Sequence, residues 1–328
     1  MLTRRRVLHQ FGLAGASLLA LRAFGGIAAS KAPLTAIDFD IPRGACDCHV
    51  HVFDPTRFPY AKDRVYTPPE ALIDELLELQ HALHLDRIVV VQPSVYGNDN
   101  SCTLDAIRRL GPRARGVAVL GKVTSRAELD DMAAAGVRGV RLNMETTTSG
   151  ELDASAVRAI LDRVAEQIRG LGWHVQIYTH PSIIAALKDY LAQLPVAVVF
   201  DHFGGAKAAL GPSQPGFDAL LGLVKSGRAY AKISGSYRIS AKRPDFADVA
   251  SLAQTLVAAN SDRIVWGTDW PHTNSRFGRA HGLAELAPPF PIDDGLLLNQ
   301  LPKWVTDPTI RKKILVDNPA RLYGFSPL

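Results

Sequence analysis

Short apolar runs alternate with longer amphipathic stretches along most of the chain after residue 44. Residues 88–91 (IVVV) and 196–200 (VAVVF) are apolar at every position, which is typical of parallel strands buried on both faces. The pattern predicts eight strands, at 45–52, 87–92, 114–120, 137–143, 174–178, 196–201, 229–234 and 264–268.

Helical patterns separate these strands, at 69–84, 103–110, 126–135, 154–171, 182–194, 217–224 and 245–260, and two more follow at 294–305 and 308–316. Strand and helix alternating eight times predict an α/β fold, a (β/α)8 TIM barrel formed by one domain over residues 44–328. An open doubly wound sheet would carry a glycine-rich phosphate loop after its first strand, and residues 53–58 (FDPTRF) contain none.

The N-terminus has the pattern of an export signal over residues 1–30. Arg4, Arg5 and Arg6 precede an apolar stretch at 11–21, which is too short to span a bilayer, and small residues follow at 25–30. The paired arginines favour the twin-arginine route. We therefore expect a periplasmic protein that is not stably inserted in the membrane after cleavage, with a linker at residues 31–43.

Charge argues against a nucleic-acid partner. The formal net charge is +5, and residues 1–29 contribute four arginines and no acid, so the remainder is near +1 (5 − 4). A nearly neutral domain without a basic stripe offers a polyanion little attraction. The pattern says nothing of the oligomeric state.

The chain has three cysteines, an odd number that does not suit a disulfide framework. Alternation along the first strand predicts two faces: Asp47, His49 and His51 on one, and Cys46, Cys48 and Val50 on the other. One metal could not gather both sets, so we interpret the cysteines as packing residues.

The active site of a barrel forms where the strands end at their carboxyl termini. The polar residues expected at those ends are His49, His51, Ser94, Arg141, Tyr178, His180, His202, Arg238 and Asp269. Each alone is more often structural than functional. Together they would converge on one mouth.

The residue types suggest a reaction. His49 and His51 could hold one divalent cation or donate hydrogen bonds to a carbonyl oxygen, and His202 could complete a metal shell or polarise the substrate. Asp269 could take a proton from water as a general base. Arg141 and Arg238 could bind carboxylates in forked fashion. Such a site favours attack of water on a polarised carbonyl beside bound anionic groups.

Several segments resemble the amidohydrolase superfamily in its amidohydrolase-related branch, and within it the 2-pyrone-4,6-dicarboxylate lactonases and sugar-acid lactone hydrolases. These are DCHVHVF at 47–53, VRLN at 140–143, DHFGG at 201–205, KISG at 232–235, GTDWPH at 267–272 and NPARLYG at 318–324. The resemblance implies a hydrolase that opens a carboxylate- or sugar-derived lactone with water. It makes Asp269 the base, places His49, His51 and His202 around the carbonyl, and gives substrate contacts to Arg141, Arg238, Ser94, Tyr178 and, less directly, Tyr66.

Two departures from the family pattern refine this expectation. Residues 137–143 contain no lysine, whereas binuclear members of the superfamily bridge their metals with a carbamylated one there, so we expect no metal or one zinc. A single ion would be held by His49, His51 and Asp269 with His180 or His202. Residues 144–148 also lack a second arginine and include Glu145, which favours a less anionic substrate such as a sugar lactone.

Three alternatives remain open. The same site could isomerise a lactone without net consumption of water. It could carry out a zinc-dependent decarboxylation, for which metal content is the discriminator. An exported binding protein without turnover is the remaining alternative, and the set of His49, His51, His202 and Asp269 argues against it.

Overall fold

The structure is a computed structural model that describes residues 34–145 and 153–326. Its eight parallel strands form one sheet in chain order: β1 (Cys46–Val50), β2 (Arg87–Val91), β3 (Ala114–Ala118), β4 (Val137–Asn143), β5 (His174–Tyr178), β6 (Val198–Phe200), β7 (Ala229–Ser234) and β8 (Ile264–Gly267). All eight predicted strands are confirmed, with ends that differ by no more than two residues.

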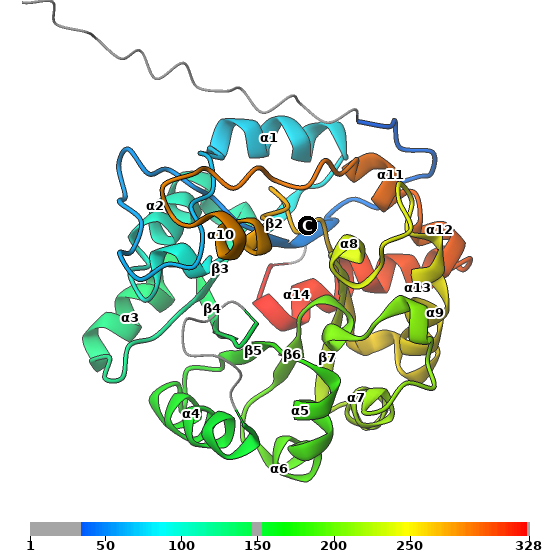
Figure 1. Cartoon of the computed structure of the whole chain (residues 1–328). Helices are drawn as coiled ribbons and strands as arrows, with labels where there is room; N and C mark the ends of the chain where they lie inside the picture. The colour runs from blue at the N-terminus through cyan, green and yellow to red at the C-terminus, as the bar shows by residue number, and fades with distance from the viewer. Residues whose placement is uncertain (1–33, 146–152, 327–328) are drawn as a thin grey trace, which may run out of the picture. The chain divides into compact units, whose positions relative to one another are not determined.

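The sheet closes between β1 and β8. The His51 N–H donates to the Trp270 carbonyl at 2.8 Å, and the Asp269 N–H donates to the His49 carbonyl at 2.9 Å. Figure 1 shows the strands at the centre, with helices such as α1 (Ile73–Ala82), α3 (Arg126–Ala135), α4 (Ala154–Gln167) and α9 (Ala250–Ala259) around them. The predicted barrel is therefore confirmed for the described residues.

The α-helices are α1 (Ile73–Ala82), α2 (Ser101–Leu110), α3 (Arg126–Ala135), α4 (Ala154–Gln167), α5 (Pro181–Ala186), α6 (Lys188–Gln193), α7 (Phe217–Lys225), α8 (Ser236–Ile239), α9 (Ala250–Ala259), α10 (Ser275–His281), α11 (Asp294–Leu298), α12 (Leu301–Trp304), α13 (Pro308–Lys312) and α14 (Asn318–Tyr323). Short 3-10 helices are η1 (Ser94–Tyr96), η2 (Gly111–Arg113), η3 (His202–Gly205), η4 (Ala208–Leu210), η5 (Ala247–Val249) and η6 (Ser261–Arg263), and η7 (Lys313–Asp317) is a π-helix.

Some helices differ from the sequence prediction. The helix expected at 182–194 is two helices, α5 and α6, which meet at Leu187. The helix expected at 294–305 is likewise divided into α11 and α12. The pattern did not predict α10, whose sequence SRFGRAH is polar and contains Gly278. That glycine is required by packing, since a Cβ there would lie 2.3 Å from the Tyr66 Cβ.

The barrel interior is separate from the larger core between strands and helices. Its apolar lining consists of Cys46, Cys48, Val89, Val91, Val117, Val199, Tyr230 and Val265, together with Tyr323 and Phe325 from the end of α14 and just beyond it. The cysteines are buried and free, so their interpretation as packing residues is confirmed. The C-terminal segment thus fills the N-terminal end of the barrel.

The predicted division of β1 into two faces is wrong. The register of β1 against β2 shifts between Asp47 and Val50, so three steps along β1 match two along β2. Cys48 therefore lines the interior near His49, whereas the Asp47 carboxylate hydrogen-bonds Gln80 of α1 outside it. A β-bulge of this kind adds one residue and reverses the alternation beyond it.

The segment before β1 packs along α11. The Thr35 N–H donates to Asp293 Oδ1 at 2.9 Å, and the Asn299 side chain donates to the Ala36 carbonyl at 2.8 Å. Gly295 permits this approach because a Cβ there would lie 1.8 Å from the Thr35 carbonyl oxygen. The predicted export signal at 1–30 lies outside the described residues. Within the described ranges, no helix has the length and apolar character needed to cross a membrane.

Candidate active site

A buried carboxylate joins the ends of β1 and β8 beneath the site. Asp47 Oδ1 accepts from the backbone N–H groups of Thr268 at 3.0 Å and His49 at 3.1 Å. Its Oδ2 accepts from the Thr268 hydroxyl at 2.7 Å and the Gln80 amide at 3.0 Å. This network places His49 next to the loop that carries Asp269, whose φ of 68° is rare for a residue other than glycine.

Asp269 has one saturated oxygen and one free oxygen. Its Oδ2 accepts from the Tyr237 hydroxyl at 2.7 Å and from Arg238 Nε, whereas Oδ1 has no hydrogen-bond partner. Burial alone would raise the pKa of Asp269, but the charge and the hydrogen bond of Arg238 hold it well below its usual range. The side chain is therefore an anion with one oxygen directed at the site.

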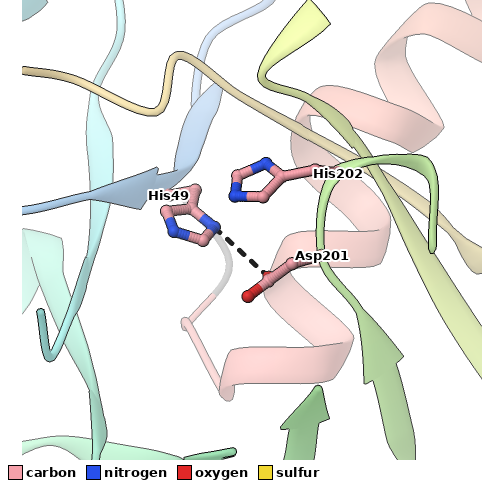
Figure 2. Close-up of side chains that lie close together, drawn as sticks. All are labelled: His49, Asp201 and His202. Carbon is pink, nitrogen blue, oxygen red and sulfur yellow. Dashed lines mark ion pairs between the residues drawn. The ribbon is translucent and has the colours of Figure 1, made fainter. Parts of the chain in front are cut away.

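Three histidine rings surround the Asp269 carboxylate. His49 Nε2 and His51 Nε2 each lie 3.7 Å from Asp269 Oδ1, and His202 Nε2 lies 3.8 Å from Oδ2. Figure 2 shows the rings of His49 and His202 facing one another beside Asp201, with ring centroids 4.7 Å apart. Burial lowers the pKa of His51 to about 3 and that of His202 to about 4, so both rings are neutral near pH 7.

The second ring nitrogens anchor two of these histidines. His51 Nδ1 lies 2.7 Å from the Val91 carbonyl, and His202 Nδ1 lies 3.0 Å from the Ser234 hydroxyl. His49 Nε2 and His202 Nε2 have no hydrogen-bond partner. The unpartnered nitrogens are the atoms available to a substrate.

The predicted substrate-binding arginines both lie next to the Tyr178 ring. The guanidinium carbons of Arg141 and Arg238 are 5.7 Å and 6.0 Å from the centre of its ring, and the ring packs edge-on against His202 at 4.9 Å. Arg141 Nε also donates to Asp201 Oδ2 at 3.2 Å. Both arginines are thus held by buried carboxylates, close to the free atoms of the histidines.

Tyr66 and Ser94 lie at the same mouth. Burial raises the pKa of the Tyr66 phenol, while hydrogen bonding to Thr273 and Ser94 and the charges of Arg238 and Arg141 lower it. The structure therefore brings Tyr66, which the resemblance implied less directly, next to Ser94, another predicted substrate contact.

His180 lies elsewhere. Its Nε2 is 3.0 Å from Glu145 Oε1, its side chain is 40% exposed, and it belongs to neither group of clustered ligand atoms. Of the two fourth ligands considered from the sequence, His202 is the one near Asp269. Residues 146–148, part of the segment that lacks a second arginine, lie outside the described residues.

The histidines and aspartates fit one metal ion in their spacing. Among the described residues, ligand atoms of His49, His51 and Asp269 lie within 4.8 Å of one another, and so do those of His49, Asp201 and His202. Tetrahedral zinc with bonds of about 2.1 Å separates its ligands by roughly 3.4 Å, close to the observed 3.7 Å. Strand β4 presents Arg141 and no lysine, so a carbamylated bridging lysine is absent from it.

Comparison with known proteins agrees with this arrangement. A family model described as amidohydrolase matches residues 46–325. The chain belongs to the amidohydrolase family. It is 38% identical to a 4-sulfomuconolactone hydrolase of Rhizobium radiobacter over 90% of this chain and 94% of that protein. It is 29% identical to a D-galactarolactone isomerase of Agrobacterium fabrum, over 90% and 96% respectively.

A solved structure from Acinetobacter baumannii, assigned as a 2-pyrone-4,6-dicarboxylic acid hydrolase and containing bound citric acid, is 27% identical. It covers 86% of this amidohydrolase and 100% of its own chain, with a TM-score of 0.70.

Sequence reasoning missed Lys232, Gln176 and Tyr237 as members of the site. Lys232 shares one face of β7 with Tyr230 and Ser234, so a polar residue at an inward position was the available signal. Asp201 entered the sequence analysis only as part of the DHFGG segment. Its contacts with Arg141 and Lys232 depend on the stagger between strands, which sequence does not specify.

Proposed function

We propose that this amidohydrolase opens a lactone with water. The observation that carries the proposal is that Asp269 is an anionic carboxylate with one free oxygen. Three neutral histidines surround this carboxylate. A base, several polarising nitrogens and two anion-binding arginines within one mouth suit acyl transfer to water.

The chemistry follows from these positions. Asp269 Oδ1 takes a proton from water as the water oxygen attacks the lactone carbonyl carbon. Negative charge then develops on the carbonyl oxygen, where a ring N–H of a nearby histidine stabilises it. The bond from the carbonyl carbon to the ring oxygen breaks, and that oxygen takes up the proton. The product is a hydroxy acid, so one water is consumed for each ring opened.

Arg141 and Arg238, both close to the Tyr178 ring, are proposed to bind a carboxylate of the substrate. A guanidinium binds carboxylates with paired hydrogen bonds, and these side chains are only 4% and 14% exposed, so water screens the attraction little. The related structure with citric acid is consistent with a carboxylate-bearing ligand. The charge of Glu145 acts on the neighbouring Tyr178, and such a carboxylate favours a lactone with few carboxylates, such as one derived from a sugar acid.

Zinc is proposed only as an optional component. His49, His51 and Asp269 would hold it, with His202 as the nearest further ligand. A bound ion would polarise the carbonyl and lower the pKa of a bound water.

The test is proton release at constant pH from pyrone carboxylates, muconolactones and aldonolactones, comparing the unmodified protein with Asp269→Asn. We expect release on one class of lactone and a loss of about 10³-fold in kcat in the variant, because general-base catalysis contributes about 10²–10⁴-fold. Unchanged release by Asp269→Asn would exclude Asp269 as the base.

Isomerisation is the second candidate, supported by the relative named as a galactarolactone isomerase. Shifting the acyl group between hydroxyls consumes no net water and releases no acid. Product NMR in water enriched in ¹⁸O separates the two reactions, because only hydrolysis places the label in the product carboxylate.

We also propose that the chain is exported to the periplasm by the twin-arginine route, on the pattern of residues 1–30. Replacing Arg5 and Arg6 with lysine should retain the protein in the cytoplasmic fraction. Unchanged periplasmic recovery of that variant would exclude this route.

A further inference from the structure

Lys232 is a buried cation that the proposed hydrolysis does not use directly. Its side chain is fully buried in the barrel, and Nζ donates to Gln176 Oε1 at 2.7 Å and to the Cys48 carbonyl at 2.9 Å. A buried ammonium is costly unless its protons are all satisfied. Two of its three donors are accounted for, and the direction of the third is informative.

Two acceptors compete for the third proton. His49 Nδ1 lies 3.3 Å from Nζ in hydrogen-bond geometry, and Asp201 Oδ1 lies at 3.4 Å. Asp201 Oδ1 has no hydrogen-bond partner, although it is also 3.3 Å from His49 Nδ1 (Figure 2). The carboxylate instead uses Oδ2, which accepts from Arg141 and Gln176 at 3.2 Å each. The third proton of Lys232 therefore points to His49.

An ammonium group only donates hydrogen bonds. His49 Nδ1 must then accept, and the single proton of the neutral ring lies on Nε2, the nitrogen without a partner beside Asp269. In His51 the proton lies on the other ring nitrogen. Its Nδ1 faces the Val91 carbonyl, which only accepts, so the proton lies on Nδ1 and the lone pair on Nε2. The two histidines of the H-x-H motif thus have opposite tautomers.

We propose that Lys232 is a positioning residue that fixes His49 as an Nε2–H donor toward the lactone carbonyl oxygen and disfavours His49 as a metal ligand. The carbonyl part rests on the proposed function, whereas the tautomer and the metal preference do not. A metal bound at His49 Nε2 needs a proton on Nδ1, and a carboxylate beside Nδ1 normally holds it there. Asp201 occupies that place, and Lys232 opposes the arrangement.

The first test uses the unmodified full chain labelled with ¹⁵N-histidine. The ¹⁵N shifts and their couplings to ring protons distinguish the two tautomers, and loss of a signal in His49→Gln assigns it. We expect the proton on Nε2 in His49 and on Nδ1 in His51. A proton on Nδ1 of His49 overturns the proposal, whether or not any lactone is opened.

The second test is Lys232→Met, with Lys225→Met on the exposed end of α7 as the matched control. The Asp201–Arg141 pair stays balanced in charge when Lys232 is removed, which favours folding of the variant. We expect the His49 proton to move to Nδ1, where Asp201 accepts it. Zinc alone should then bind about 10-fold more tightly than to the unmodified chain, because a carboxylate that orients a histidine ligand raises its affinity by roughly that factor or more.

The activity readout distinguishes positioning from general damage. Lys232→Met should lower kcat by about 10²-fold with KM changed less than threefold, as expected for loss of one hydrogen bond made to a developing oxyanion. An unaltered His49 tautomer with unaltered zinc affinity in a folded variant would contradict the proposal. If the variant fails to fold, the spectrum of the unmodified chain decides.

Discussion

The two ends of the barrel interior are both filled by buried side chains, yet only one end is suited to chemistry. At the N-terminal end, Tyr323 and Phe325 enter from below, and the guanidinium carbons of Arg87 and Arg115 lie 5.1 Å and 4.6 Å from the Phe325 ring. At the C-terminal end, His49, His202 and Asp269 present atoms without partners.

Unpartnered polar atoms alone do not mark the functional end. The N-terminal end also has them, since the Tyr323 hydroxyl and both ring nitrogens of His174 lack hydrogen bonds. There the His174 ring packs edge-on against Tyr323 at 5.2 Å, and it lies so close to Gly139 that a Cβ would come within 2.4 Å of it. No carboxylate pairs with these groups in the described residues. At the other end the free atoms converge on Asp269, an anion paired with Arg238, and that convergence is what identifies the site.

The largest effect that would sharpen this comparison is expected at the N-terminal end. Tyr323→Ala should lower the free energy of unfolding by about 3–5 kcal/mol, because it leaves a cavity in place of a fully buried aromatic ring. The kcat/KM of the folded fraction should stay within about twofold, since the ring does not reach the site. Urea unfolding and rates measured on the same preparation check both statements.

Tyr323→Phe is the matched control. The hydroxyl has no partner, so its removal should leave stability unchanged or slightly higher. A loss of activity in either Tyr323 variant at full folding would show that the two ends are coupled, and would remove the distinction drawn here.

The next largest effect is expected at the C-terminal end, where a substitution should change activity more than stability. His202→Asn should lower kcat/KM by about 10²-fold, roughly 2.7 kcal/mol, by deleting one polarising nitrogen. Its stability should change by less than about 1 kcal/mol, because asparagine tolerates the left-handed backbone of this position, where φ is 47°. Thermal unfolding followed by circular dichroism, together with initial rates, is the measurement. Greater loss of stability than of activity would assign His202 a structural role.

The sequence predicted the barrel well because apolar runs report burial on both faces of a strand, as in β2 and β6. It failed where one residue changes the geometry. The bulge in β1 separates Asp47 from His49, and nothing in the letters DCHVH distinguishes a regular strand from a bulged one. The helix α10 was missed because its sequence has no apolar stripe and contains Gly278. That glycine is explained by close packing on Tyr66.

The candidate site was predicted as a set of strand ends but not as a set of contacts. His49, His51, His202, Asp269, Arg141, Arg238 and Tyr178 do come together, since the C-terminal ends of barrel strands share one mouth. Pairings such as Arg238 with Asp269, and Lys232 with His49, depend on stagger and side-chain direction. These pairings determine which atoms are free, and therefore the proposed chemistry.

The smallest expected effect is the pH dependence of activity and stability. It distinguishes His202 at the C-terminal end from His174 at the N-terminal end. Between pH 9 and 6 kcat/KM should be nearly constant, and it should fall about twofold by pH 4, where half of the His202 rings are protonated. Asp269 stays ionised over this range because its pKa lies well below the usual value.

The free energy of unfolding should also decrease as the pH is lowered, because a buried histidine lies at each end of the barrel. Burial lowers the pKa of His202 to about 4 and that of His174 to about 3, whereas histidines of the unfolded chain have a pKa near 6.5. Between about pH 6.5 and these lowered values the unfolded chain therefore binds more protons than the folded chain, and stability is lost as the pH drops. His174→Phe should reduce this acid destabilisation and leave the activity profile unchanged, as measured by urea unfolding and initial rates at each pH. A shifted activity profile in that variant would place His174 within reach of the reaction.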